Sequence, residues 1–285
     1  MTPEVKAFFD EATNTVTYVV RDPMGTACAV IDSVLDFDYA SGRTDTRAAD
    51  AVVAWIRAQG LVLHWVLETH VHADHLSAAP YLQEALGGQL GIGDRITVVQ
   101  ETFGKVFNEG TRFARDGSQF DRLFGEGDTF MLGQMRGLVM HTPGHTPACL
   151  TYVIGDAAFV GDTLFMPDYG TARCDFPGGS AAVMYDSIQR ILALPDATRI
   201  FVCHDYKAPG RDAFAWESTV GAQKALNKHL GQDKAAFVAM REARDATLAM
   251  PRLIIPSLQV NMRAGHMPEA DDNGVAYLRV PVNGM

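Results

Sequence analysis

Cysteine is scarce in this chain of 285 residues. The four cysteines are Cys28, Cys149, Cys174 and Cys203, and no two of them form a Cys-x-x-Cys pair. In a reducing compartment such cysteines are free thiols, and disulfides are rare there. The sequence therefore predicts four free thiols rather than a scaffold held by disulfides.

Long apolar runs and an excess of basic residues are also missing. No apolar run approaches the roughly 18 residues of a membrane span, and the N-terminus lacks the basic-then-apolar pattern of a secretory signal. Acidic residues outnumber basic ones by 34 to 24, which gives a net charge of −10 and counts against nucleic-acid binding. We expect a soluble cytoplasmic protein that binds neither membrane nor nucleic acid.

The remaining composition is that of an ordinary globular protein, with 47% hydrophobic and 20% charged residues. There are no repeats, low-complexity tracts or linkers, and short predicted strands alternate with predicted helices. Strands are predicted at 16–20, 27–31, 61–67, 137–141, 149–154, 157–160 and 199–203, and helices at 47–59, 76–86, 180–192, 212–230 and 234–247. This order predicts an α/β fold with packed sheets and outer helices.

One motif, Thr69-His70-Val71-His72-Ala73-Asp74-His75, follows a predicted strand and is rich in metal-ligand side chains. Alternate residues of an extended segment point to one side, so His70 and His72 are placed to share a metal, with Asp74 and His75 turned toward a neighbouring position. Imidazole and carboxylate groups suit Zn²⁺, Fe²⁺ and Mn²⁺. A lone histidine is usually structural, but three histidines and an aspartate within six residues favour a metal site.

Three further candidates also follow predicted strands: His145, Asp162 and His204. Each has an ordinary structural explanation when taken alone, such as a turn histidine or a capping aspartate. Together they supply one ligand at each strand end, where open α/β sheets bind their ligands. The four isolated histidines, which we interpret as non-ligands, are His64, His141, His229 and His266.

These motifs, in order and rough spacing, resemble the metallo-β-lactamase superfamily. The matching segments are Thr69–His75, Thr142-Pro143-Gly144-His145-Thr146, Gly161-Asp162 and His204-Asp205-Tyr206. The resemblance extends from about residue 16 to residue 206. It implies one domain over residues 1–285, an αββα sandwich with a helical C-terminal extension at about 212–250.

Within the superfamily, the chain is most similar to persulfide dioxygenases (sulfur dioxygenases), in particular to a bacterial subgroup. Thiolester hydrolases of the glyoxalase II type carry Pro-Gly-His-Thr-x-Gly-His, whereas Cys149 replaces the second histidine here. The stretches 161–176 and Asn261-Met262-Arg263-Ala264-Gly265 also resemble the dioxygenases. One departure is a longer loop around Arg173, where many family members have Gly-Cys-Gly-Arg-Thr-Asp.

The resemblance implies one Fe(II) per chain, held by His70, His145 and Asp162. Such a set of two histidines and one carboxylate leaves coordination positions open for substrate and O₂. The implied reaction oxidises glutathione persulfide with O₂ to sulfite and glutathione. The remaining residues of the motifs would then orient the ligands or belong to a second metal site; these are His72, Asp74, His75 and His204.

Four residues are candidates for substrate binding. Arg173 is expected to contact a glutathione carboxylate, and Tyr206 to donate a hydrogen bond near the substrate sulfur. Lys228 and Cys174 are further candidates, although a solvated lysine and a cysteine packed as a small apolar residue are equally ordinary. By resemblance we also expect a homodimer or a higher homo-oligomer.

The main alternative is a dinuclear zinc thiolester hydrolase that acts on glutathione conjugates, since every ligand that it needs is present. One metal would be bound by His70, His72 and His145, and the other by Asp74, His75 and His204, with Asp162 bridging them. A metal-bound hydroxide would be the nucleophile. A nuclease and a non-catalytic binding module are weaker alternatives, because the chain is acidic and its ligand set is complete.

Overall fold

The strands form two mixed sheets in a computed structural model that describes all 285 residues. The first sheet has the order β1-β2-β3-β6-β7-β8 and the second the order β14-β13-β12-β11-β10-β9. The first contains β1 (Glu4–Asp10), β2 (Thr15–Arg21), β3 (Ala27–Ile31), β6 (Val62–Leu67), β7 (Gln89–Gly93) and β8 (Arg122–Phe124). The second contains β9 (Thr129–Leu132), β10 (Met135–His141), β11 (Leu150–Ile154), β12 (Ala157–Phe159), β13 (Arg199–Phe201) and β14 (Glu217–Thr219). A separate hairpin consists of β4 (Asp36–Asp38) and β5 (Arg43–Asp45).

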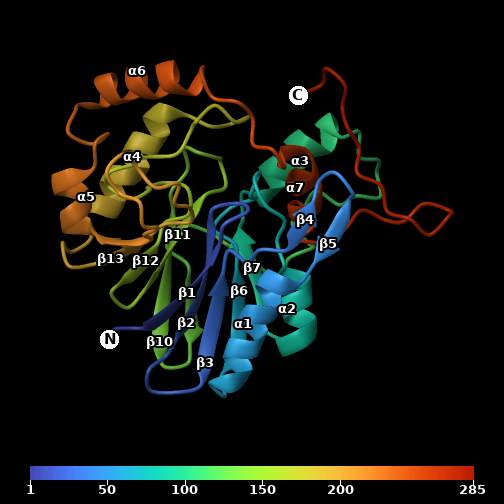
Figure 1. The fold of residues 1–285 in the computed structure, drawn as a ribbon, viewed down its shortest axis with the longest axis horizontal. Helices are drawn as coiled ribbons and strands as arrows, with labels where there is room; N and C mark the ends of the chain where they lie inside the picture. The colour runs from blue at the N-terminus through green and yellow to red at the C-terminus, as the bar shows by residue number, and fades with distance from the viewer.

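Helices cover the outer face of each sheet (Figure 1). Those packed on the first sheet are α1 (Arg47–Ala58), α2 (Ala79–Leu86), α3 (Ile96–Val106) and α7 (Ile254–Asn261). Those on the side of the second sheet are α4 (Ala181–Leu192), α5 (Val220–Leu226) and α6 (Lys234–Asp245). The result is the predicted α/β, αββα sandwich.

Three apolar clusters account for this layering. The middle one joins the inner faces of the two sheets, with Tyr18 and Tyr152 among its buried side chains. The outer ones join each sheet to its helices, with Ile56 of α1 on one side and Phe237 of α6 on the other. Helices such as α1 and α4 bury one apolar stripe and leave the other face to solvent, as an amphipathic helix should, whereas α7 is buried on nearly all sides.

The strands that precede the ligand motifs all end at one edge of the sandwich. In the first sheet β3 and β6 are parallel. In the second, β12 and β13 are parallel, and β10 shares their direction because both β10 and β12 are antiparallel to β11. Motifs far apart in the sequence therefore meet beyond the carboxyl ends of these strands.

The structure differs from the predicted elements in the last third of the chain and at several short strands. The helix predicted at 212–230 is wrong in its first half, since β14 pairs with β13 there and only Val220–Leu226 is helical. Helix α2 begins at Ala79 rather than at 76, with Pro80 in its first turn. Elements not predicted are β1, the β4–β5 hairpin, β7, β8, β9, α3 and α7.

Two further expectations concern disulfide bonds and membrane-spanning helices. All four cysteines are buried and unpaired, as predicted. None of the helices combines the length and apolarity needed to cross a membrane.

Candidate metal centre

The turn after β6 fixes His70 with its Nε2 atom free. The Thr69 hydroxyl donates to Asp32 at 2.9 Å and lies 3.0 Å from Nδ1 of His70. Because its proton is directed at Asp32, the hydroxyl accepts from Nδ1–H, and the lone pair of His70 is then on Nε2. Burial and the neighbouring histidines, His72 and His145, hold the pKa of His70 well below its usual value, which keeps this imidazole neutral.

His145 is oriented in the same way from the other sheet. Its Nδ1 lies 2.8 Å from the carbonyl oxygen of Arg173, which can only accept, so Nδ1 carries the proton and Nε2 the lone pair. The Nε2 atom lies 3.5 Å from Oδ2 of Asp162. Outer hydrogen bonds of this kind set the tautomer of metal-ligating histidines.

His70, His145 and Asp162 thus form one compact group. One ligand atom from each lies within 4.8 Å of the others, and all three residues are buried. Two imidazole nitrogens and a carboxylate oxygen are ligands suited to a divalent transition metal. The donor set and its orientation fit a metal ion held at this point.

Two glycines allow the ligand-bearing turns to approach their neighbours. Gly161 has φ +51°, and a Cβ there would lie 2.6 Å from the Thr69 hydroxyl oxygen. Gly144 has φ +144°, and a Cβ there would lie 2.4 Å from the backbone of Met184 in α4. Only glycine permits both the conformation and the contact, so the turns that present Asp162 and His145 depend on these positions.

A second group lies beside the first and contains His72, Asp74, His75 and His204, again with ligand atoms within 4.8 Å of one another. Nε2 of His204 lies 3.1 Å from Asp74 and 3.3 Å from Asp162. The Nε2 atoms of His75 and His204 and Oδ1 of Asp162 are buried without a hydrogen-bond partner. Buried polar atoms normally have partners, so this group also fits a cation, with Asp162 between the two positions.

His72 is bound to carboxylates on its outer side. Its Nε2 lies 2.9 Å from Asp32 and 3.2 Å from Glu68, and all three side chains are buried. Although burial alone would lower it, the two carboxylates raise the pKa of His72. Nδ1 of His72 has no hydrogen-bond partner, so only that nitrogen is open toward the second group.

A cavity of about 1210 Å³ opens onto the first group. Its lining includes His70, His145 and Asp162, and also Asp74 of the second group. The three histidines of the second group, by contrast, are fully buried and do not line the cavity: His72, His75 and His204. A substrate in this cavity therefore meets the first group directly.

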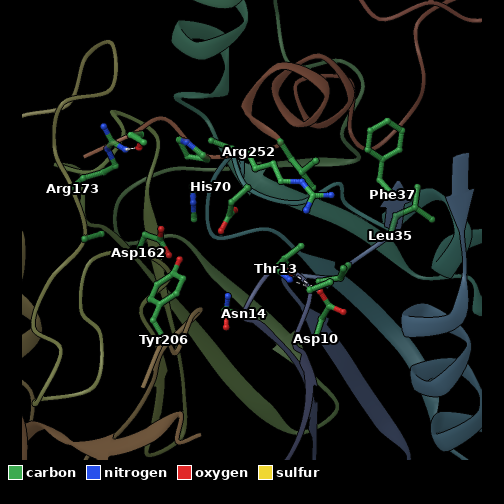
Figure 2. A pocket seen from close by; sticks show the side chains of 18 of the residues that line it. Asp10, Thr13, Asn14, Leu35, Phe37, His70, Asp162, Arg173, Tyr206 and Arg252 are labelled. Atoms are coloured by element: carbon green, nitrogen blue, oxygen red, sulfur yellow. Dashed lines mark hydrogen bonds between the residues drawn. The ribbon is translucent and has the colours of Figure 1, made fainter. Parts of the chain in front are cut away.

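The predicted substrate-binding residues fall into two pairs. Arg173 and Tyr206 line the cavity, where Figure 2 shows them on either side of Asp162. Lys228 does not line it, and its ammonium lies 5.2 Å from the centre of the Tyr169 ring. Cys174 does not line it either, since its thiol packs 3.6 Å from the sulfur of Met184, and burial raises its pKa.

The structure changes the expected role of Arg173. Its guanidinium makes two 2.6 Å contacts with Asp175, and its third nitrogen donates to the Ala249 carbonyl at 2.7 Å. A guanidinium engaged on both edges has little left to offer a substrate carboxylate. Instead, the carbonyl of Arg173 orients His145, so this loop supports the metal centre.

Some residues of the site escaped the sequence analysis. Asp32 follows the apolar strand β3 just as the ligand motifs follow their strands, so the same pattern indicated it. Arg241, Arg244 and Arg252 also line the cavity. They come from the C-terminal segment, where no motif distinguished them from surface charges.

Comparison with known proteins agrees with this geometry. The family profile of the metallo-β-lactamase superfamily matches residues 11–204. The chain belongs to this superfamily. It is 56% identical to a probable metallo-hydrolase of Burkholderia pseudomallei, over 99% of each chain. It is 44% identical to glyoxylase B2 of Dictyostelium discoideum, over 98% of this chain and 97% of the relative.

The chain is also similar to persulfide dioxygenases at lower identity. It is 29% identical to the mitochondrial persulfide dioxygenase ETHE1 of Mus musculus, over 92% of this chain and 88% of the relative. The crystal structure of ETHE1 from Myxococcus xanthus superposes with a TM-score of 0.74 at 28% identity, covering 92% of this chain and all of that one. Superfamily membership and two buried ligand groups indicate a metal-dependent enzyme.

Proposed function

We propose that this metallo-β-lactamase superfamily member is a persulfide dioxygenase that oxidises glutathione persulfide with O₂ to sulfite and glutathione. The observation that carries the proposal is the group of His70, His145 and Asp162. It combines two histidines with one carboxylate, and all three of its residues line the cavity, whereas only Asp74 of the second group does. Similarity to ETHE1 over 92% of the chain supports the same reaction.

When bound at this group, an Fe(II) ion supplies activation of O₂ and attraction for a sulfur anion. The protein contributes the geometry around it. Thr69 and the Arg173 carbonyl hold His70 and His145 in the tautomer that presents Nε2. Phe165 and Phe176 line the cavity and add apolar surface to it, and the ring centre of Phe176 lies 5.1 Å from that of His145. Tyr206, which is 40% exposed and lines the same cavity, is placed to donate a hydrogen bond to the substrate.

The second candidate function is a dinuclear zinc thiolester hydrolase of the glyoxalase II type. Two observations favour it: the second group has orphaned buried nitrogens on His75 and His204, and the relatives at 44–56% identity are named a metallo-hydrolase and a glyoxylase. His72 bears on this alternative, because the hydrolase needs it as a ligand of the first metal, whereas in the structure its ligand atom groups with Asp74, His75 and His204. Its Nε2 is already bound to Asp32 and Glu68, which leaves Nδ1 as its one free nitrogen.

The deciding experiment measures metal content and two activities on one preparation, purified without added metal. The dioxygenase predicts about one iron per chain and O₂ uptake with glutathione persulfide, matched one to one by sulfite. The hydrolase predicts two zincs per chain, no O₂ uptake, and release of glutathione from S-lactoylglutathione. The second pattern would overturn our proposal.

A further inference from the structure

Six arginines line the cavity of the metal centre, together with six aspartates. Three of the arginines are neutralised by ion pairs. Arg173 binds Asp175, Arg241 binds Asp245, and Arg47 lies 3.4 Å from both Asp36 and Asp45. These three guanidinium groups hold the wall of the cavity together. The other three have no carboxylate within ion-pair distance; they are Arg43, Arg244 and Arg252.

Two of the unpaired arginines flank one segment. Arg244 is in the last turn of α6, and Arg252 lies two residues before the start of α7 at Ile254. The connection between them contributes Leu248, Ala249 and Pro251 to the cavity lining. The third, Arg43, lies on β5 of the β4–β5 hairpin, where Asp38 is its partner in the strand register.

The side chain of Arg252 extends into the cavity, and in the view of Figure 2 it lies between His70 and Phe37. Arg244 also lines the cavity, and its positive charge contributes to lowering the pKa values of Lys228 and His229, which burial lowers most. Neither guanidinium donates a hydrogen bond to any protein group, although each has five N–H donors. Unpaired guanidinium groups around a substrate cavity are suited to binding carboxylates or phosphates through two parallel hydrogen bonds.

We propose that Arg252 and Arg244 bind the two carboxylates of the substrate, and that the α6–α7 connection selects thiol derivatives that carry two separated carboxylates, as glutathione conjugates do. The proposal rests on the proposed function for the identity of the reacting sulfur. It assigns to these two residues the carboxylate contact that the sequence assigned to Arg173. The apolar residues between the arginines cover the backbone of the bound molecule.

The test measures binding of S-methylglutathione, a non-reacting conjugate, to the metal-loaded protein by titration calorimetry. Losing a charge-assisted contact of this kind costs about 1.5–3 kcal/mol, which is roughly a 10- to 100-fold rise in Kd. We expect that rise in R252A and in R244A, and a larger one in the double variant. R252K should bind with an intermediate Kd, since lysine keeps the charge but loses the planar pair of donors.

The matched control is R136A, which removes an exposed arginine of β10 that does not line the cavity; its Kd should equal that of the unaltered protein. The diethyl ester of S-methylglutathione should bind the unaltered protein weakly, and R252A should weaken it no further. The inference is overturned if the acid and the ester bind equally well, or if R252A and R244A bind like R136A. This test measures binding and no reaction. Its result can therefore still be interpreted if the protein fails the dioxygenase assay.

Discussion

Asp32 lies 2.9 Å from Nε2 of His72 and also accepts hydrogen bonds from the backbone N–H and the hydroxyl of Thr69. One buried carboxylate at the end of β3 therefore organises the turn that carries His70 and the orientation of His72. Burial alone would raise its pKa, but His72 and Thr69 lower it, so the group stays ionised.

The first prediction follows from this position. Asp32→Asn removes the charge that holds His72 and weakens the anchor of the His70 turn, so we expect metal affinity to fall about 10- to 100-fold. Competition with a calibrated chelator measures it. Asp128→Asn, at an exposed position remote from the centre, is the control. Unchanged affinity in Asp32→Asn would show that the turn holds its shape without this carboxylate.

The second prediction concerns how many metal ions are bound. With one iron held by His70, His145 and Asp162, His70→Ala should abolish iron binding and activity. His204→Ala should keep about one iron per chain at saturating iron, because it removes only a neighbour of Asp162. Elemental analysis of both variants decides the matter. A fall from two metals to one in His204→Ala would support the dinuclear hydrolase.

The third prediction concerns the buried pair of Arg241 and Asp245, one turn apart on α6. Asp245 also accepts from the backbone N–H of Cys174, and Arg241 donates to the Thr171 carbonyl at 3.0 Å. Arg241→Met leaves a buried carboxylate unpaired, and we expect a loss of about 3–5 kcal/mol in the free energy of unfolding.

Urea denaturation measures this loss. The control is Lys105→Met, which breaks the exposed 2.8 Å pair with Glu101 and should cost less than about 1 kcal/mol. If the two variants lose similar stability, Asp245 must find water or another donor once Arg241 is gone.

The fourth prediction concerns pH. His229 accepts a hydrogen bond from the Thr171 backbone at 3.1 Å, and burial together with the nearby Arg241 and Lys228 lowers its pKa from 6.5 to about 4. As the pH falls below 6.5, the unfolded chain takes up a proton at this residue and the native chain does not. Stability is therefore lost in that direction, by about 1 kcal/mol between pH 7 and pH 5.5.

The variant His229→Asn keeps an acceptor near the Thr171 N–H but does not titrate. The difference in unfolding free energy between the two proteins should change by about 1 kcal/mol across this interval, in favour of the variant at low pH. Subtraction cancels the titration of all the groups that the proteins share. A difference that is constant with pH would mean that His229 is protonated equally in both states.

The sequence determined the fold and the residues that form the two candidate ligand groups. Apolar runs that end in His-rich or Asp-rich motifs predicted strands with ligands at their carboxyl ends, and β6, β10, β12 and β13 meet at one edge as this requires. These candidate ligands were predictable because metal chemistry restricts residue types and the turns restrict their spacing. Short strands such as β8 and β14 were missed, since three residues carry too little periodicity.

The tertiary structure decided what each polar residue does within the site. No local pattern distinguishes Arg173, which is bound to Asp175, from Arg252, which lines the same cavity without an ion pair (Figure 2). The same holds for Asp32, which lies 40 residues before His72 in the chain and 2.9 Å from it in space. Long-range pairing assigns these roles, because whether a charge is free or neutralised depends on residues that only folding brings near.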